Sequence, residues 1–292
     1  MHLKAVCLSI LFLMLGHSFK SHANKLPNNL AAYQAKFAHT LLVVHFNHPF
    51  YGNIEFIKKL YSPILPNIVF YGEKAHPEIH VVETHYGYLF TRVMADAMRR
   101  YPQYEGYLFL QDDCIINIWN CYTLDSNKIW YAVRFNADRN TVPSPSEKFE
   151  LALDISQDHI PTDWDWWASN WGVVPAREAI GNLTSTQRVF LEKNAGRNRI
   201  VGCVCDMFYV PQRFRNQVIS LALNFKDIFC EIAVPTLLCC LDPISNWEQL
   251  KMLWTFALDP YPAQFTWIHP IKLSQPSNRA QLLRIFNVYL GR

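Results

Sequence analysis

The chain predicts an α/β fold of the Rossmann-like kind, in which a mostly parallel central sheet is flanked by helices. Strand-like apolar runs alternate with segments of helical periodicity between Thr40 and Asp112, and this alternation is typical of parallel sheets. The run Tyr107-Leu-Phe-Leu110 is apolar at every position, as in a strand that is buried on both faces. No repeat, low-complexity tract or Gly/Ser linker interrupts residues 24–292, so we expect one domain there.

The individual elements follow from local pattern and from turn residues. The predicted strands are 40–46, 67–71, 78–83, 107–110, 129–133 and 200–205, and the predicted helices are 53–61, 88–100 and 213–225. The Pro- and Ser-containing segment 140–147 is expected to form a turn region or flap.

The first 23 residues are typical of a secretory signal peptide. Lys4 is followed by an apolar core of 12 residues, Ala5 to Gly16, and Ala23 ends a plausible cleavage site. The core is shorter than the roughly 20 residues that cross a bilayer. An uncleaved signal anchor is the alternative. We therefore expect the protein in the secretory pathway, in the Golgi lumen or secreted, with membrane association only through this segment.

The charge balance and the glycine content argue against some classes of function. The chain has 27 basic and 24 acidic residues, and cleavage after Ala23 would remove Lys4 and Lys20, leaving 25 basic residues against 24 acidic ones. This balance argues against nucleic acid as a partner, which favours a basic face. With 10 glycines and no Gly-x-Gly-x-x-Gly or Walker loop, any phosphate is expected to be held by a metal ion and side chains.

The cysteines allow disulfides but do not reveal a pairing. One of the eight, Cys7, lies in the leader, and the odd number that remains leaves at least one thiol unpaired or intermolecular. Buried structural cysteines or disulfides are favoured over a thiolate metal site, because no Cys-x-x-Cys spacing occurs. The sequon Asn182-Leu-Thr184 is consistent with a secreted glycoprotein.

Two adjacent carboxylates, Asp112 and Asp113, follow the central strand. Ligands of open α/β sheets bind at the carboxyl ends of strands. Neighbouring carboxylates repel one another unless a cation or a shared proton relieves them, so a divalent-metal site is the simplest explanation. A strand cap followed by a turn is the alternative.

Two further groups are candidate ligand contacts. His45 and Asn47 follow the first strand and should lie at the same sheet edge as Asp112, where they would hold a base or ribose; a polar turn without a ligand is the alternative. Trp166, Trp167 and Trp171 belong to a tryptophan cluster whose composition suits a sugar ring, although an aromatic core patch has the same composition.

Asp206 and Glu231 are candidate catalytic acids or bases. Asp206 follows the apolar run 200–205 and is expected at the rim of the site, where it could bind an acceptor hydroxyl. Glu231 carries the one charge between Ile228 and Leu241, so it is near the surface, paired, or a base with a raised pKa.

In combination, several motifs resemble the GT-A nucleotide-diphospho-sugar glycosyltransferase superfamily, and within it the group that includes the plant Golgi STELLO proteins. These motifs are Gln111-Asp-Asp113, Asn117-x-Trp-Asn120, Asp206-x-Phe-Tyr-Val-Pro211 and His269-Pro-Ile-Lys-Leu273. The first departs from the family's Asp-x-Asp element. By the family's roles, Asp113 would bind the metal directly, and Asp112 would bind ribose or support the metal.

The resemblance also implies roles near the C-terminus. His269 would complete the metal site with the two aspartates and the donor's diphosphate oxygens, and its nitrogen makes Mn²⁺ a better ion than Mg²⁺. Lys272 would neutralise the departing diphosphate.

The sequence thus predicts a metal-dependent glycosyltransferase that moves a sugar from a nucleotide-diphosphate sugar to a hydroxyl of a glycan or protein. Glu231 or Asp206 would activate the acceptor. One alternative is a catalytically inactive relative that acts as a scaffold or a glycan-binding protein, and another is a metal phosphohydrolase.

Overall fold

The computed structural model describes residues 30–133, 151–157 and 165–291. A seven-stranded central sheet has the order β10-β6-β9-β4-β1-β2-β3. Its strands are β1 (Thr40–His45), β2 (Asn67–Gly72), β3 (Ile79–Val81), β4 (Gly106–Gln111), β6 (Trp130–Tyr131), β9 (Met207–Pro211) and β10 (Glu248–Gln249). Strands β1 to β4 are parallel, whereas β9 is antiparallel to both β4 and β6. The predicted Rossmann-like α/β class with a mostly parallel sheet is confirmed.

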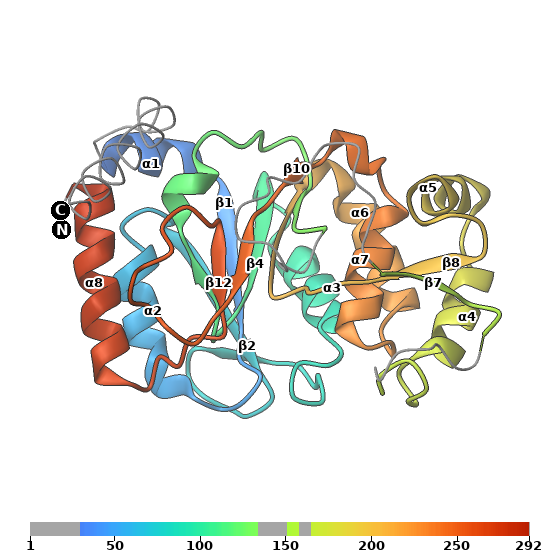
Figure 1. The fold of residues 1–292 in the computed structure, drawn as a ribbon, viewed down its shortest axis with the longest axis horizontal. Coiled ribbons are helices and arrows are strands. Elements are labelled where there is room, and N and C mark those ends of the chain that lie inside the picture. The colour runs from blue at the N-terminus through green and yellow to red at the C-terminus, as the bar shows by residue number, and fades with distance from the viewer. Residues whose placement is uncertain (1–29, 134–150, 158–164, 292) are drawn as a thin grey trace, which may run out of the picture.

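Helices cover both faces of the sheet (Figure 1). On one side lie α2 (Ile54–Tyr61) and α8 (Pro276–Leu290), and on the other α3 (Thr91–Arg100), α6 (Arg215–Asn224) and α7 (Cys230–Cys239). Beyond α7 in this view lie α4 (Val173–Gly181), α5 (Ser185–Ala195) and the two-stranded sheet of β7 (Leu151–Asp154) and β8 (Arg199–Gly202). The remaining helix, α1 (Leu30–Phe37), precedes β1.

Two hydrophobic cores result from the alternation of side chains along the buried strands. Leu41 and Phe109 belong to the core that includes α3, α6 and α7, and their neighbours Leu42 and Leu108 belong to the core that includes α2 and α8. Successive residues of a strand point to opposite faces of a sheet. An uninterrupted apolar run is therefore what a strand covered on both sides requires.

Helix ends follow local sequence rules. Thr184 caps α5 in a capping box with Gln187, which satisfies two backbone N–H groups at the helix start. Helix α8 begins with Pro276 and ends at Gly291 in the left-handed conformation, a residue that adopts it without steric cost.

A third, smaller sheet carries the C-terminal part of the chain to the carboxyl end of β4. It comprises β11 (Met252–Trp254), β12 (Trp267–His269) and β5 (Ile115–Ile116), in that order. Between β5 and β6 lies the 3-10 helix η3 (Ile118–Cys121), and the other 3-10 helices among the described residues are η2 (Tyr51–Asn53), η4 (Gln212–Phe214) and η5 (Ile244–Asn246). Because β5 begins two residues after Asp113, its pairing with β12 places the C-terminal segment beside the aspartates.

The strands expected at 40–46, 67–71 and 107–110 and the helices expected at 53–61, 88–100 and 213–225 are present with small shifts at their ends. The strands expected at 78–83 and 129–133 are shorter, since the ladder pairing covers Ile79–Val81 and Trp130–Tyr131.

The strand expected at 200–205 is present but ends earlier, so that Asp206 does not follow it directly. Strand β8 ends at Gly202 and pairs with β7, whereas the central sheet is joined by β9, the apolar run that follows Asp206. Both runs have strand composition, and composition does not tell which of them meets the sheet.

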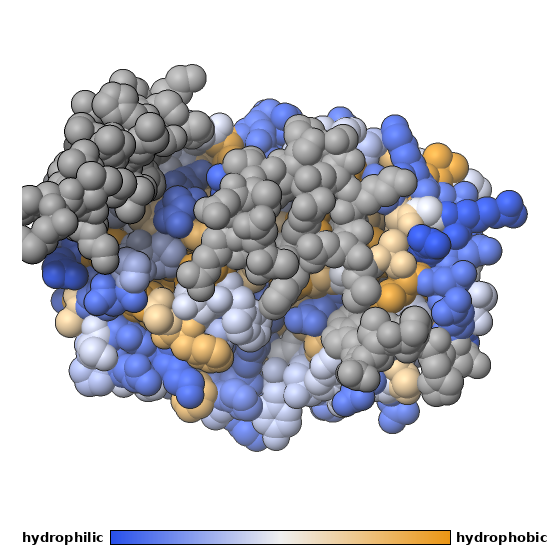
Figure 2. Space-filling model, viewed as in Figure 1, coloured by the Kyte–Doolittle hydropathy of each residue, from blue (hydrophilic) through white to orange (hydrophobic). Residues whose placement is uncertain are grey.

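Some predictions lie outside the described residues, namely the leader 1–23 and the flap 140–147. Within the described residues, none of the helices combines the length and the apolar composition needed to cross a bilayer. On the face shown in Figure 2, hydrophilic residues predominate along much of the outline, and hydrophobic residues are visible between them.

Candidate active site

Three strands bring two acids and a histidine together. Asp113 follows the end of β4, Asp206 precedes β9, and His269 is the last residue of β12. Since β9 runs antiparallel to β4, its beginning lies beside the end of β4, and the backbone N–H of Gln111 donates to the carbonyl of Asp206 at 2.9 Å. The N–H of Ile271 donates to the carbonyl of Asp113 at 2.6 Å, which ties the segment after His269 to the same place. We call Asp113, Asp206 and His269 the strand-end cluster.

The imidazole of His269 lies between the two carboxylates. Its Nε2 is 3.2 Å from Oδ2 of Asp113 and 3.6 Å from Oδ1 of Asp206. The side chains of His269 and Asp206 are 11% and 9% exposed, whereas that of Asp113 is 36% exposed. The cluster is therefore open to solvent on the Asp113 side, where a ligand can approach.

The motif Asn117-x-Trp-Asn120 holds this arrangement in place. The side-chain amides of Asn117 and Asn120 both donate to the carbonyl of Phe265 at 2.8 Å, and Asn117 N–H donates to the carbonyl of Thr266 at 2.8 Å. These bonds attach the segment that leads into β12 to the segment that follows the aspartates. The motif thus positions His269, although it does not belong to the cluster itself.

The site carries more negative than positive charge. Besides the strand-end cluster it includes Asp112, which is buried, and Glu231, which is half-buried in the first turn of α7 and interacts electrostatically with Asp206 and His269. Burial raises the pKa of Asp206, and it raises the pKa of Glu231 to about 7 with help from the charge of Asp206. Burial opposes the charged form of His269, but Asp206 and Asp113 outweigh it and raise the pKa of His269 to about 9.

A cation would relieve this imbalance, and the donor types present suit one. Asp113 Oδ1 and Asp206 Oδ2 are buried without a hydrogen-bond partner, and such atoms are costly unless a ligand satisfies them. Nδ1 of His269 is unpartnered too, but the two nitrogens of an imidazole point apart, so an ion held by Nε2 would leave Nδ1 unsatisfied. Among the described residues, however, no group of three or more His, Cys, Asp or Glu side chains is already arranged to hold a metal ion. To bind an ion, Nε2 of His269 would have to give up its contact with Asp113 and coordinate the ion instead.

The two adjacent aspartates face different surroundings. Asp113 contacts His269, whereas Oδ1 of Asp112 accepts a hydrogen bond from the N–H of Asn47 at 3.3 Å. Burial, reinforced by the charge of Asp113, raises the pKa of Asp112 to about 8. The metal roles predicted for Asp113 and Asp112 both remain predictions.

The turn after β1 contacts Asp112, as expected for His45 and Asn47. The amide of Asn47 donates to Oε1 of Gln111 at 2.6 Å, and its own Oδ1 is buried without a partner. His45 is fully buried against Thr84 Oγ1 at 3.1 Å, and burial lowers its pKa to about 4. Both residues carry a buried polar atom without a partner, Oδ1 of Asn47 and Nδ1 of His45.

The loop beside Asn47 has an unusual backbone conformation that was not predicted from the sequence. His85, Tyr86 and Gly87 have consecutive positive φ angles of 49°, 60° and 92°. A side chain at Gly87 would overlap Oδ1 of Asn47, so glycine lets this loop approach the turn after β1. The dipeptide Tyr86-Gly87 was the available sequence signal, because glycine marks positions of positive φ.

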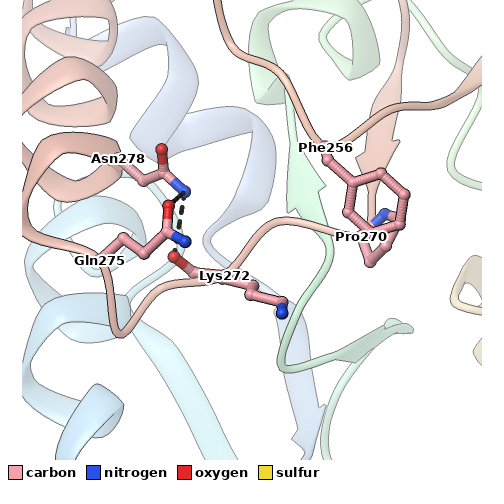
Figure 3. A pocket seen from close by; sticks show the side chains of 5 residues that line it. All are labelled: Phe256, Pro270, Lys272, Gln275 and Asn278. Carbon is pink, nitrogen blue, oxygen red and sulfur yellow. Dashed lines mark hydrogen bonds between the residues drawn. The ribbon is translucent and has the colours of Figure 1, made fainter.

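Lys272 is exposed beyond the cluster. It lines a hollow of ≈ 170 Å³ together with Phe256, Pro270, Gln275 and Asn278 (Figure 3). The side chain of Asn278 donates to the carbonyl of Lys272 at 3.1 Å, which leaves the ammonium group pointing away from Asn278 and Gln275. Two aromatic residues nearby were not predicted: Trp254 packs edge-on against His269, with ring centroids 4.8 Å apart, and Phe256 is 66% exposed.

The tryptophan cluster divides into buried and partly open rings. Trp167 is fully buried in the core, which leaves its face unavailable to a sugar. Trp166 stacks on Phe229 at 4.3 Å, and Trp171 packs near His85 at 5.6 Å. Trp166 and Trp171 are only partly buried and remain candidates for ligand contact. Trp164 lies outside the described residues.

The chain is similar to two proteins of Arabidopsis thaliana. It is 22% identical to Probable glycosyltransferase STELLO2 over 274 residues, which is 88% of this chain and 33% of that protein. It is also 22% identical to Probable glycosyltransferase STELLO1 over 269 residues, which is 88% of this chain and 32% of that protein. The chain therefore spans about a third of the length of the curated relatives it matches. No protein-family model matches it.

Proposed function

We propose that the chain is a metal-dependent glycosyltransferase of the GT-A type, which moves a sugar from a nucleotide-diphosphate sugar to a hydroxyl acceptor. The observation that carries the proposal is the meeting of Asp113, Asp206 and His269 at the end of β4. The similarity to two proteins named as probable glycosyltransferases supports it.

In this proposal Asp113, Asp206 and His269 hold the cation. The imidazole nitrogen favours Mn²⁺ over Mg²⁺. When bound, the cation would stabilise the negative charge of the leaving diphosphate. Asp206 replaces Asp112 in the predicted ligand set because it is Asp206 that faces His269. Asp112 keeps the role of a ribose or supporting partner, since it contacts the turn after β1.

Glu231 is the proposed base that removes the proton from the acceptor hydroxyl. Its pKa of about 7 lets it accept a proton near neutral pH, and its half-buried position leaves it within reach of a ligand. Asp206 is the poorer candidate for this role because its carboxylate is next to His269.

The donor would lie across the carboxyl ends of β1 and β4. Asn47 offers an unpartnered oxygen to a base or ribose, and the exposed ammonium of Lys272 is free to approach the diphosphate. Trp166 and Trp171 would contact the sugar or the acceptor. We place the reaction in the secretory pathway because of the leader-like residues 1–23.

The test is calorimetric titration of the full chain with a panel of UDP-sugars, with Mn²⁺ and with chelator. We expect heat of binding that requires Mn²⁺, and transfer to a hydroxyl acceptor with the donor that binds. A thermal-shift screen with Mn²⁺ selects the donor first, because a ligand that binds the native state raises its unfolding temperature. Absence of Mn²⁺-dependent binding across the panel would favour the inactive scaffold or glycan-binding protein.

The base is tested by Glu231→Gln, with Glu55→Gln as its matched control. Both glutamates lie in the first turn of a helix, but the side chain of Glu55 is 80% exposed and pairs with Lys58 on the outside of α2. We expect Glu231→Gln to retain donor binding and to lower the transfer rate by about 100-fold or more, whereas Glu55→Gln leaves both unchanged. If Glu231→Gln transferred the sugar at the wild-type rate, another residue would have to be the base.

A further inference from the structure

Two buried cysteines are in contact with one another beside the site. The cysteines of the described residues are present as thiols at Cys114, Cys121, Cys203, Cys205, Cys230, Cys239 and Cys240. Each of the thiols of Cys205 and Cys230 shifts the pKa of the other through a side-chain interaction, as expected of close neighbours, and both side chains belong to the core formed with α3, α6 and α7. These residues are 25 positions apart in sequence, so the contact closes a loop that contains β9 and α6.

Each of the two cysteines directly precedes an acid of the site. Cys205 is followed by Asp206, and Cys230, the first residue of α7, is followed by Glu231. The two segments are also joined through the backbone, because the N–H of Cys203 donates to the carbonyl of Glu231 at 2.8 Å. The thiol contact is thus a second link between the same two segments.

The surroundings of the pair argue against a nucleophile or a thiolate ligand. Burial raises the pKa of the Cys205 thiol well above its ordinary value, which disfavours the reactive thiolate. Cys205 and Cys230 are 1% and 5% exposed, so external reagents have little access to either sulfur. A disulfide that forms before the sulfurs are buried needs no such access afterwards.

We propose that Cys205 and Cys230 form a disulfide that fixes the segment carrying Asp206 against the start of the helix carrying Glu231. The two thiols together lose two protons and two electrons, and an exchanging disulfide such as oxidised glutathione accepts them and becomes two thiols. The reaction passes through a mixed disulfide, which the second thiolate resolves. Oxidation takes place while the chain folds, before the sulfurs are buried. The inference concerns how the site is held together and does not rest on the proposed transferase activity.

The disulfide is tested by peptide mapping of the full chain. The protein is folded in a glutathione redox buffer, its remaining thiols are alkylated, and it is cleaved with trypsin without reduction. We expect a cross-link between the peptides Ile200–Arg213 and Asp227–Lys251. These peptides also contain Cys203, Cys239 and Cys240, so the cross-link should disappear in Cys205→Ala and in Cys230→Ala but persist in Cys203→Ala and Cys239→Ala.

A second measurement compares the unfolding temperatures of the oxidised and the reduced protein. A cross-link lowers the entropy of the unfolded chain, so we expect the oxidised form to unfold several degrees higher. This difference should be lost in Cys230→Ala and kept in Cys203→Ala. If a variant does not fold, fragmentation of the wild-type cross-linked peptide still locates the bond.

Complete alkylation of Cys205 or Cys230 after folding in oxidising buffer would overturn the proposal, as would a cross-link through Cys203. Donor binding measured on the same samples separates the two hypotheses. An intact cross-link without Mn²⁺-dependent donor binding counts against the transferase alone, and binding without the cross-link counts against the disulfide alone.

Discussion

At the scale of single residues, side chains that are adjacent in sequence have different contacts. Asp112 and Asp113 are adjacent, yet one contacts the turn after β1 and the other contacts the histidine of β12. Successive residues leave a strand in different directions, so a pair of acids at a strand end can serve two parts of a ligand. The two aspartates therefore make a matched pair for mutation.

We expect Asp113→Asn to abolish the Mn²⁺ dependence of donor binding, and Asp112→Asn to weaken donor binding while its Mn²⁺ dependence remains. The physical reason is that a neutral amide in place of the Asp113 carboxylate would no longer balance the charge of the ion, whereas Asp112 accepts a hydrogen bond from the turn after β1. Titrations of both variants with and without Mn²⁺ measure this. If Asp113→Asn keeps its Mn²⁺ dependence, Asp113 does not bind the ion.

His45 predicts a pH dependence of stability. Burial lowers its pKa to about 4, below the value of about 6.5 for an unfolded histidine. The folded state thus binds fewer protons, so stability is complete above pH 6.5 and falls as the pH decreases from about 6.5 to 4. Between pH 7 and pH 5 this group should cost about 2 kcal/mol of unfolding free energy.

The check is urea denaturation of wild type and of His45→Gln at the two pH values. Glutamine does not titrate and can still bond to Thr84, so the variant should lose about 2 kcal/mol less than wild type over this interval. Equal losses in the two proteins would mean that His45 does not titrate in this way.

At the scale of elements, β9 decides where the acids lie. It is inserted between β4 and β6 in the opposite direction, which places Asp206, at its start, beside the end of β4. Close packing of β4 against β9 is therefore a requirement of the site. At Gly106, the first residue of β4, a side chain would overlap the ring and hydroxyl of Tyr209 from β9.

Gly106→Ala should accordingly destabilise the protein by about 1–3 kcal/mol, since the added methyl group forces Tyr209 out of its place. Gly181→Ala is the control, because a side chain at Gly181 meets no atom within 4 Å. That change should be neutral or slightly stabilising, as alanine favours a helix more than glycine does. Denaturant unfolding of both variants measures the difference. Equal stabilities would show that β9 accommodates the added methyl group without a loss of unfolding free energy.

At the scale of the whole molecule, a buried carboxylate of the candidate site affects the stability of the fold. Asp206 has a raised pKa because of burial, so its ionised form lowers the stability of the fold near neutral pH. Sites that bind cations commonly have this cost, since their charges are arranged for the ligand rather than for the empty protein.

We therefore expect Asp206→Asn to raise the unfolding temperature in chelator and to remove the further stabilisation that Mn²⁺ and donor give to wild type. The unfolding temperatures of wild type and variant are measured in chelator and again with Mn²⁺ and donor. A variant that is less stable than wild type in chelator would indicate that the contact of Asp206 with His269 outweighs the cost of its burial.

The sequence by itself determined the α/β class, the central strand and the acids that follow it. A run such as Tyr107–Leu110 has few ways to bury side chains on both faces, and charge that follows directly must lie at the sheet's edge. Only the tertiary structure decided that Asp206 faces His269, that Trp167 is buried, and that β9 rather than β8 joins the central sheet. These depend on pairing between segments far apart in the chain. The β-propensity of a segment does not depend on which strand it pairs with. The packing of the whole core determines the pairing.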